Sequence, residues 1–269
     1  MSWRIAAASA VGTSHELTGL PCQDSFGVEL VDTSHGAVLV SVVSDGAGSA
    51  AHSERGSKVA VETSLHLIRG YLNAGGTVSS IQRDLAVSWV SEIQRVITEL
   101  TEQADSTARE FACTLLVAII GSDSAAFVQI GDGAMVTANE AEGGWSYIFW
   151  PQHGEFANTT NFVTSPHSTE IMDFELADRR IDNFASFSDG IENLVLHHST
   201  KSVHAPFFTS MLGPVQQLAR PGLDNPLSES LAKYLSSPRV CERTDDDKSL
   251  VLASRASCLV DTAADASPS

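Results

Sequence analysis

Two long segments in the first half of the chain carry apolar residues at helical spacing. The first stripe recurs every three or four residues, at Val61, Leu65, Ile68 and Leu72, before the pair Gly75-Gly76. The second stripe repeats nearly every four residues, at Ile81, Leu85, Trp89, Ile93, Ile97 and Leu100. The spacing predicts two amphipathic helices on either side of the glycines. We expect them to pack as an antiparallel hairpin.

Short apolar runs surround this helix pair, separated by Gly, Asn, Asp and Pro. One run precedes it, at 38–43, and the others follow it, at 114–120, 125–130, 145–149, 162–165, 184–187 and 250–253. Runs of this length between turn residues are typical of β-strands. Their short connections favour antiparallel pairing.

A helical insertion separates the last two predicted strands. Residues 191–196, 207–218 and 227–235 have helical patterns, and five prolines between 206 and 238 divide them. The chain therefore runs in the order strands, helix pair, strands, helices, strand. This order predicts an α+β fold, an antiparallel β-sandwich flanked by helices on both outer faces, rather than alternating βαβ units.

The composition predicts one domain followed by a tail. The chain has 269 residues and no linker-like segment in its middle, so we expect a single catalytic domain at 1–254. Residues 255–269 are rich in Ser, Ala and Asp, a composition that cannot bury enough apolar surface to fold. We expect this segment to be disordered.

The charge balance limits the partners. With 16 Lys and Arg against 33 Asp and Glu, the net charge is -17, which repels nucleic-acid phosphates and anionic lipids. No apolar run approaches the roughly 20 residues that a membrane span needs. Four scattered cysteines lack the spacing of a zinc site, and the first residues lack the apolar core of a signal peptide. We expect a cytoplasmic protein with free thiols and with neither nucleic acid nor membrane as a partner.

Acidic residues stand next to several predicted strands. Three Asp-Gly pairs, at Asp45, Asp132 and Asp189, closely follow apolar runs, and an acidic triplet at 245–247 precedes another. Carboxylates are hard oxygen ligands that suit Mg²⁺ or Mn²⁺, and glycine lets the backbone approach an ion closely. Four such strand ends, if they meet, build one metal site. The residues alone therefore favour metal-dependent hydrolysis.

These acidic motifs have a recognisable order. They are Gln23-Asp24, Asp45-Gly46, Gly131-Asp132-Gly133, Ser188-Asp189-Gly190 and Asp246-Asp247. An Asp-Gly pair alone is a common turn, but the order, the strands before the pairs and the helix pair between the second and third motifs agree. From about residue 10 to about residue 253, the chain resembles the metal-dependent type 2C protein phosphatases, the PPM family, and especially its short bacterial members.

The resemblance implies a serine/threonine phosphoprotein phosphatase with a centre of two Mn²⁺ or Mg²⁺ ions. Asp45 would bridge the two ions, and Asp132 would hold a third, weaker ion. A hydroxide between the ions would attack the phosphomonoester in line. The implied partners are proteins phosphorylated on Ser or Thr and a cognate kinase. The expected metal-binding set is Asp24, Asp45, Gly46, Asp132, Asp189 and Asp246.

Several positions depart from the usual pattern of this family. Gln23 replaces a glutamate, so one ion would be held more weakly. Ala47 replaces a histidine, so another group must protonate the leaving group. Asp247 replaces an asparagine, which changes the hydrogen bonds around the ligand Asp246. The usual phosphate-binding arginine is absent, and we assign the catalytic role of phosphate contact to His15.

Each of these residues also has an ordinary structural interpretation. The Asp-Gly aspartates could be turn residues held by Asx hydrogen bonds, and for Asp132 this alternative is nearly as strong as metal binding. His15 could be a surface-loop histidine. Within the acidic triplet, we expect Asp245 in solvent and Asp246 pointing inward.

Two other functions stay open at this point. Gln23 and Ala47 suggest an inactive phosphatase-fold module that binds phosphopeptides or regulates a partner. A hydrolase of small phosphate esters would use the same site on another substrate. A serine hydrolase is disfavoured, because neither Ser44 nor Ser188 lies in a Gly-x-Ser-x-Gly motif.

Overall fold

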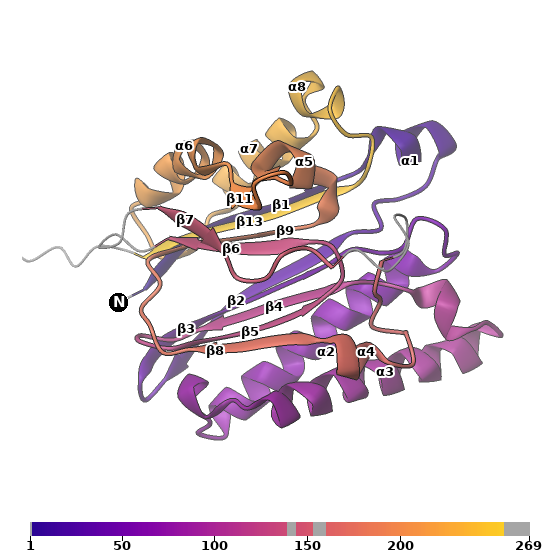
Figure 1. Cartoon of the computed structure of the whole chain (residues 1–269), viewed down its shortest axis with the longest axis horizontal. Helices are drawn as coiled ribbons and strands as arrows, with labels where there is room; N and C mark the ends of the chain where they lie inside the picture. The colour runs from indigo at the N-terminus through magenta and orange to yellow at the C-terminus, as the bar shows by residue number, and fades with distance from the viewer. Residues whose placement is uncertain (1, 139–143, 153–159, 256–269) are drawn as a thin grey trace, which may run out of the picture.

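Two β-sheets stack face to face, and helices cover the outer face of each sheet (Figure 1). This computed structural model describes residues 2–138, 144–152 and 160–255. Within that part of the chain, strand pairs are antiparallel except for the two-residue pairing of β12 (Gly222–Leu223) with β1 (Trp3–Ala10). The predicted α+β sandwich with helices on both outer faces is therefore confirmed.

The five-stranded sheet is buried on both faces. In spatial order it consists of β2 (Ser25–Thr33), β3 (Gly36–Ser44), β4 (Leu115–Ile120), β5 (Ala125–Ile130) and β8 (Asp173–Ala177). Along β3, Val40 and Val42 pack towards the helix pair, whereas Leu39 and Val43 pack towards the other sheet. Successive side chains of a strand point to opposite faces. A strand covered on both sides is therefore mostly apolar, and in β3 even the polar Ser41 is buried.

The six-stranded sheet brings the two ends of the described chain together. In spatial order it consists of β12, β1, β13 (Lys248–Arg255), β9 (Asn183–Phe187), β6 (Ala134–Ala138) and β7 (Trp145–Tyr147). The first strand, β1, pairs along its whole length with the last strand, β13. A separate hairpin is formed by β10 (Leu196–His197) and β11 (Ser202–Val203).

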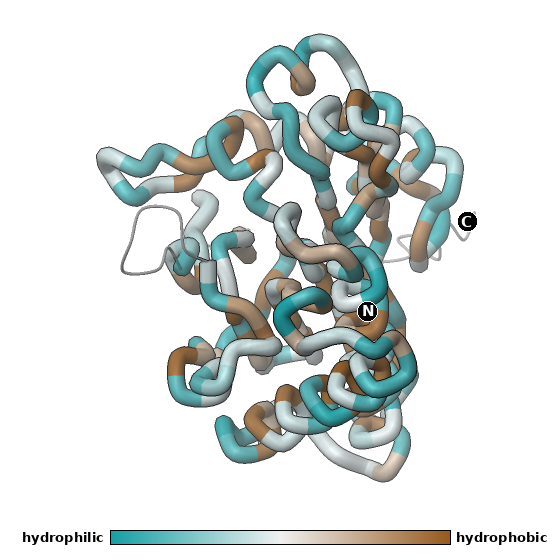
Figure 2. The backbone as a smooth tube through the Cα atoms, turned by 90° about the vertical axis from the view of Figure 1, so that its right-hand side faces the viewer, coloured by the Kyte–Doolittle hydropathy of each residue, from teal (hydrophilic) through white to brown (hydrophobic). Residues whose placement is uncertain are grey.

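The predicted helix pair packs on the five-stranded sheet as α2 (Ser53–Asn73) and α3 (Arg83–Ala104). Hydrophobic and hydrophilic segments alternate along both helices, as expected for amphipathic helices (Figure 2). After α2 the chain turns at Gly75, whose φ of 91° favours glycine. Short 3₁₀ helices follow each member of the pair, η1 (Val78–Ser80) and η2 (Ala108–Phe111).

The second helical layer covers the six-stranded sheet with α6 (Ala205–Gln216) and α7 (Asn225–Leu235). The Asp224 side chain caps α7 by accepting a hydrogen bond from the Leu227 amide at 2.8 Å. The remaining short helices are α1 (Thr13–Thr18), α4 (Ser168–Ile171), η3 (Asp189–Ile191), α5 (Glu192–Val195) and α8 (Pro238–Cys241).

Three apolar cores fill the spaces between the layers. Trp89 belongs to the core under the helix pair, Phe184 to the core between the sheets, and Phe208 to the core under α6 and α7. Burying a large apolar side chain contributes about 1.5–3 kcal/mol. Both faces of both sheets are therefore packed. This packing fixes the strand ends, and with them the residues that follow each strand.

The predicted elements differ from the structure in a few places. The predicted strand at 162–165 is wrong, because this segment forms a turn in which the Ser165 amide donates to the Phe162 carbonyl at 3.0 Å. β1, β6 and β8 were not predicted. β13 runs to Arg255, one residue past the predicted domain end, and the guanidinium of Arg255 lies 4.6 Å from the ring centroid of Trp3. The segment 256–269, expected to be a tail, lies outside the described residues.

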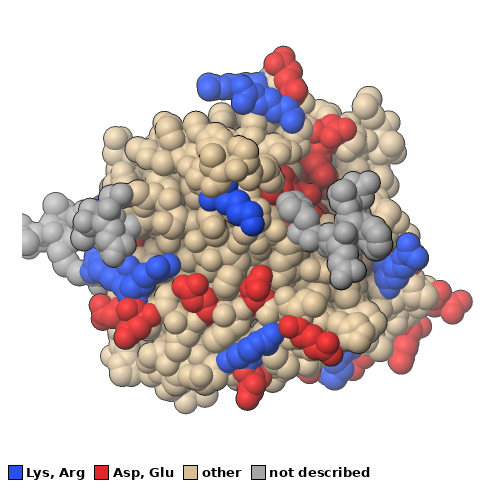
Figure 3. Space-filling model, in the orientation of Figure 1, with Lys and Arg blue, Asp and Glu red and all other residues tan. Residues whose placement is uncertain are grey.

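Acidic and basic side chains lie in small groups on the face shown in Figure 3. None of the helices within the described ranges has the length and apolarity to cross a bilayer.

Candidate metal centre

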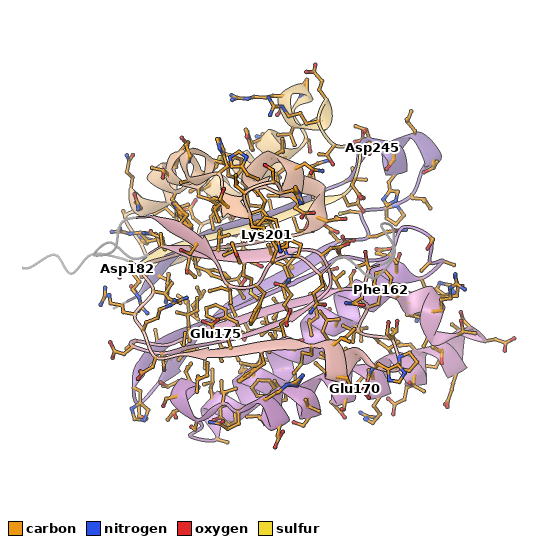
Figure 4. The ribbon with its side chains drawn as sticks, in the orientation of Figure 1. Phe162, Glu170, Glu175, Asp182, Lys201 and Asp245 are labelled. Carbon is orange, nitrogen blue, oxygen red and sulfur yellow. The ribbon has the colours of Figure 1, made fainter. Side chains whose placement is uncertain are left out.

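Strand register collects the predicted motifs at one end of the sandwich. β2 begins opposite the end of β3, which places Asp24 beside Asp45. β9 ends opposite the beginnings of β6 and β13, which brings together the segments of Asp132, Asp189 and Asp246. Figure 4 shows labelled side chains of both layers, Asp245 and Phe162, at this same end of the molecule.

Three carboxylates form the centre of this end. Asp45, Asp132 and Asp189 each offer an oxygen, and these oxygens lie within 4.8 Å of one another. The sequence predicted all three as metal ligands, and the fold brings them together. Thr114 holds the backbone of Asp45, because the Asp45 amide donates to Thr114 Oγ1 at 2.9 Å and the Thr114 amide donates to the Asp45 carbonyl at 2.8 Å. Such a group of oxygens suits a divalent cation.

Two glycines of the motifs allow the segments to approach closely. A Cβ at Gly46 would lie 2.7 Å from the carbonyl oxygen of Gln23. A Cβ at Gly190 would lie 1.8 Å from the carbonyl oxygen of Asp247. Any other residue at either place would force these backbones apart. The structure thus gives both glycines a packing reason, while the Gly46 carbonyl as a metal ligand stays a prediction.

Several buried oxygens at this end have no partner. Asp24 is 6% exposed, and its Oδ2 accepts a hydrogen bond from Ser188 Oγ at 2.6 Å. Among the described atoms, Asp24 Oδ1, Asp189 Oδ1 and Gln23 Oε1 are buried and make no hydrogen bond. Buried polar atoms almost always have partners, and a bound ion is one explanation for exceptions. These oxygens therefore fit a cation.

Burial and mutual repulsion raise the pKa values of these carboxyl groups. Burial, with the nearby charges of Asp247 and Asp189, raises the pKa of Asp24 to about 7. Burial and the charge of Asp132 raise the pKa of Asp189 to about 7. Burial and the charges of Asp24 and Asp189 hold the pKa of Asp45 well above its ordinary value. Grouped carboxyl groups that resist ionisation need either protons or a cation among them.

The match to known proteins agrees with this arrangement. The family model described as Protein phosphatase 2C matches residues 11–236. The chain belongs to this family.

Similar proteins support the same conclusion. Serine/threonine-protein phosphatase 3 of Escherichia coli (strain K12) is 36% identical over 254 residues, which cover 94% of this chain and 98% of that protein. Stp1 from Staphylococcus aureus, a serine/threonine phosphatase, has a TM-score of 0.59 at 14% identity and is covered over 95% of each chain. PppA, a regulatory component of T6SS in Pseudomonas aeruginosa, has a TM-score of 0.60 at 16% identity over 95% of this chain and 98% of its own. The two structural likenesses show the fold, and the curated relative supports a serine/threonine protein phosphatase.

In this family member, Asp247 is the enclosed residue of the acidic triplet. It is 2% exposed, and its carboxylate accepts the amides of Gly12 at 2.6 Å and Gln23 at 2.5 Å. Asp246, which we expected to point inward, is the exposed neighbour. Asp247 is therefore the buried member of the triplet, because the backbone amides of Gly12 and Gln23 face it, while the direction of the Asp246 carboxylate stays a prediction. Sequence reasoning noted Asp247 only as a departure from asparagine.

His15 is buried against Asp247 and does not lie in an exposed loop. It is 8% exposed on α1, and its Nδ1 lies 2.9 Å from Asp247 Oδ2. An ionised carboxylate only accepts hydrogen bonds, so Nδ1 is the donor. His15 thus contacts Asp247 and is not part of the Asp45, Asp132 and Asp189 group. Its contact with phosphate stays a prediction.

Sequence reasoning missed two further charged residues here. Lys248 is fully buried, and its ammonium donates to the carbonyls of Asp246 at 2.8 Å and Val11 at 3.4 Å. Burial, with the charges of Asp132 and Asp189, raises the pKa of Glu192 to about 8. The only signals in the sequence are a lysine at the start of an apolar run and a glutamate three positions after Asp189.

Proposed function

We propose that this chain is a Mn²⁺- or Mg²⁺-dependent phosphatase of proteins phosphorylated on Ser or Thr. The observation that carries the proposal is the group formed by Asp45, Asp132 and Asp189, whose oxygens lie within 4.8 Å of one another on a protein phosphatase 2C fold. A cognate kinase that supplies the phosphorylated substrates is the expected partner.

The residues that would hold the ions come from both sheets. Asp45, Asp132 and Asp189 offer the central oxygens. Asp24 Oδ1 is buried and unpartnered among the described atoms, and it supplies a fourth. The Gly46 carbonyl and Asp246 complete the proposed set. Two ions held there would supply positive charge to the phosphate and would lower the pKa of a bound water, the nucleophile that this reaction needs at neutral pH.

The protein's own residues hold this set in position. Ser188 fixes Asp24 at 2.6 Å, and Thr114 fixes the backbone of Asp45. Asp247 gathers the amides of Gly12 and Gln23, so the first motif lies against the last one. Positioning of this kind reduces the rearrangement that a reaction needs.

His15 is proposed to contact the substrate phosphate. Asp247 holds one ring nitrogen, which fixes the tautomer and the orientation of the ring. The other nitrogen, Nε2, makes no hydrogen bond with any other described residue. Ala47 offers no proton, so the group that protonates the leaving group lies elsewhere in the site.

The experiment that tests the function compares two substrates under three metal conditions. Turnover of p-nitrophenyl phosphate and of a phosphoserine peptide is measured in EDTA, in Mg²⁺ and in Mn²⁺. We expect activity only with metal, and higher catalytic efficiency on the peptide. Full activity of metal-free protein would refute the mechanism. Absence of turnover with intact peptide binding would favour the inactive module, and a preference for small esters would favour the small-substrate hydrolase.

A further inference from the structure

A cavity of about 340 Å³ lies next to the carboxylate group. Three segments of the chain form its walls: the loop that follows Asp45, the residues of η2, and the turn at 162–166. The lining residues used below are Ala47, Ala50, Arg109, Glu110, Phe162 and Pro166. All six lie outside the proposed metal-binding set.

Both walls of this cavity are close along the chain to the proposed site. Ala47 is two residues from Asp45, and its amide donates to the Ala112 carbonyl at 2.9 Å. The opposite wall begins just after Thr160, whose hydroxyl donates to Asp132 Oδ2. A substrate side chain bound in the cavity would therefore come from a residue only a few positions away from the phosphorylated residue, whose phosphate lies at the carboxylates.

Arg109 is the cation of this cavity that has no partner of its own. Its side chain is exposed and forms no hydrogen bond or ion pair with another described residue. Glu110 lies beside it, but its Oε2 already accepts the Ala51 amide at 2.9 Å. The guanidinium has a planar fork of donors that matches a carboxylate. In a chain with a net charge of -17, this free arginine favours an anion.

The other walls suit an aliphatic stem. Ala47, Ala50, Phe162 and Pro166 offer apolar surface to the cavity. A glutamate has methylene groups that fit such walls and a carboxylate that reaches an arginine, whereas an aspartate has a shorter stem. Apolar surface beside one charged group that has no partner is typical of a pocket for one side chain.

We infer that this cavity binds an acidic side chain that flanks the phosphorylated residue of a protein substrate. Arg109 is then a specificity-determining residue outside the metal centre. The inference rests on the proposed function, because it assumes that the substrate phosphate binds at the carboxylates. What it adds is a preference for substrates with an acidic residue near the phosphorylated one.

Binding to the complete chain tests the cavity without turnover. The peptides carry a non-hydrolysable phosphonate analogue of phosphoserine and have Glu, Gln or Lys at one flanking position in turn, and their dissociation constants are measured by calorimetry in Mn²⁺. At one position or more, wild type should bind the Glu peptide about fivefold more tightly than the Gln peptide, as expected for an exposed ion pair. Arg109→Glu should lose this preference and favour the Lys peptide.

Two variants serve as controls. Arg220→Glu makes the same change of charge near Gly222, which pairs with Arg4 at the far end of β1, and should keep the wild-type preference. Glu110→Gln keeps an acceptor for the Ala51 amide and should bind the Glu peptide at least as tightly as wild type.

The outcomes separate the cavity from the catalytic proposal. Equal preferences of wild type and Arg109→Glu at every flanking position would overturn the inference. Turnover of p-nitrophenyl phosphate, measured in parallel, tests catalysis alone and should be the same in wild type and Arg109→Glu. An inactive wild type that still shows the charge-dependent preference would refute the catalytic proposal and support the cavity.

Discussion

Ser188 donates its hydroxyl to Asp24 Oδ2 at 2.6 Å, and this hydrogen bond joins the two sheets at the metal-binding end. Asp24 precedes β2 of the five-stranded sheet, and Ser188 follows β9 of the six-stranded sheet. Only one oxygen of Asp24 is used, because Oδ1 has no partner among the described atoms. The contact therefore holds a carboxylate in place across the sandwich and leaves an oxygen for a cation.

The metal-free protein should lose stability as the pH rises. The pKa of Asp24 is raised from 3.8 to about 7, and that of Asp189 is raised in the same way. Between these two pH values the folded protein binds more protons than the unfolded chain, so its stability falls as the pH increases. In EDTA, the melting temperature should be higher at about pH 5 than at about pH 7.5.

Bound Mn²⁺ and the substitution of Asp24 should each reduce the dependence of stability on pH. Mn²⁺ at neutral pH replaces the missing protons and should raise the melting temperature. Asp24→Asn should flatten the curve in EDTA, whereas Asp123→Asn, at an exposed residue of the β4–β5 turn, should leave it unchanged. A melting temperature that rises from pH 5 to pH 7.5 in EDTA would contradict the raised pKa values.

Asp45→Asn should abolish turnover and leave the protein folded. The change removes a charge from the proposed metal set, and we expect turnover to fall roughly a thousandfold or more. The melting temperature in EDTA should stay the same or rise, because the charges of Asp24 and Asp189 repel that of Asp45 in the absence of metal. Kinetics at saturating Mn²⁺ and thermal unfolding in EDTA check the two parts. A near-wild-type rate would make Asp45 a turn residue.

The sequence predicted the sandwich because its signals are periodic and local. The stripes through Leu65 and Ile93 became α2 and α3, and the run 125–130 became β5 without a change of bounds. β1 was missed because half of its residues are alanine, which carries little preference for strands. Its place in the sheet comes from pairing with β13, more than 200 residues away, which no local pattern shows.

The site was predictable only in part for a similar reason. Asp45, Asp132 and Asp189 each follow a strand, so their meeting could be expected from the motifs. The burial of Asp247 could not be expected, because it depends on two amides from the distant segment 12–23. Which of two adjacent carboxylates is enclosed is decided by the acceptors that the rest of the fold requires.

Gln23→Glu should lower the metal concentration that gives half-maximal activity. Gln23 is 6% exposed, and its Oε1 is buried without a partner among the described atoms. A carboxylate there adds a negative oxygen beside Asp24, and the affinity of such sites rises with ligand charge. We expect a decrease of roughly tenfold in a Mn²⁺ titration. The same variant without metal should be less stable than wild type, because it adds another repelling charge. An unchanged metal requirement would show that this side chain does not face the ions.

His15→Ala should raise the KM for a phosphopeptide about tenfold, with a smaller change in kcat, as expected when a hydrogen bond to a charged group is lost. The ring is held by Asp247 at 2.9 Å, so its removal could also disturb the amides that Asp247 gathers. His15→Asn separates the two effects, because an amide still donates to Asp247 but is shorter than imidazole. If it restores the melting temperature while the KM stays raised, the ring contacts phosphate.

His66→Ala, at an exposed histidine of α2, should leave both kinetic constants unchanged. Wild-type kinetics of His15→Ala across about pH 6 to 9 would remove His15 from the site and assign phosphate binding to the ions alone.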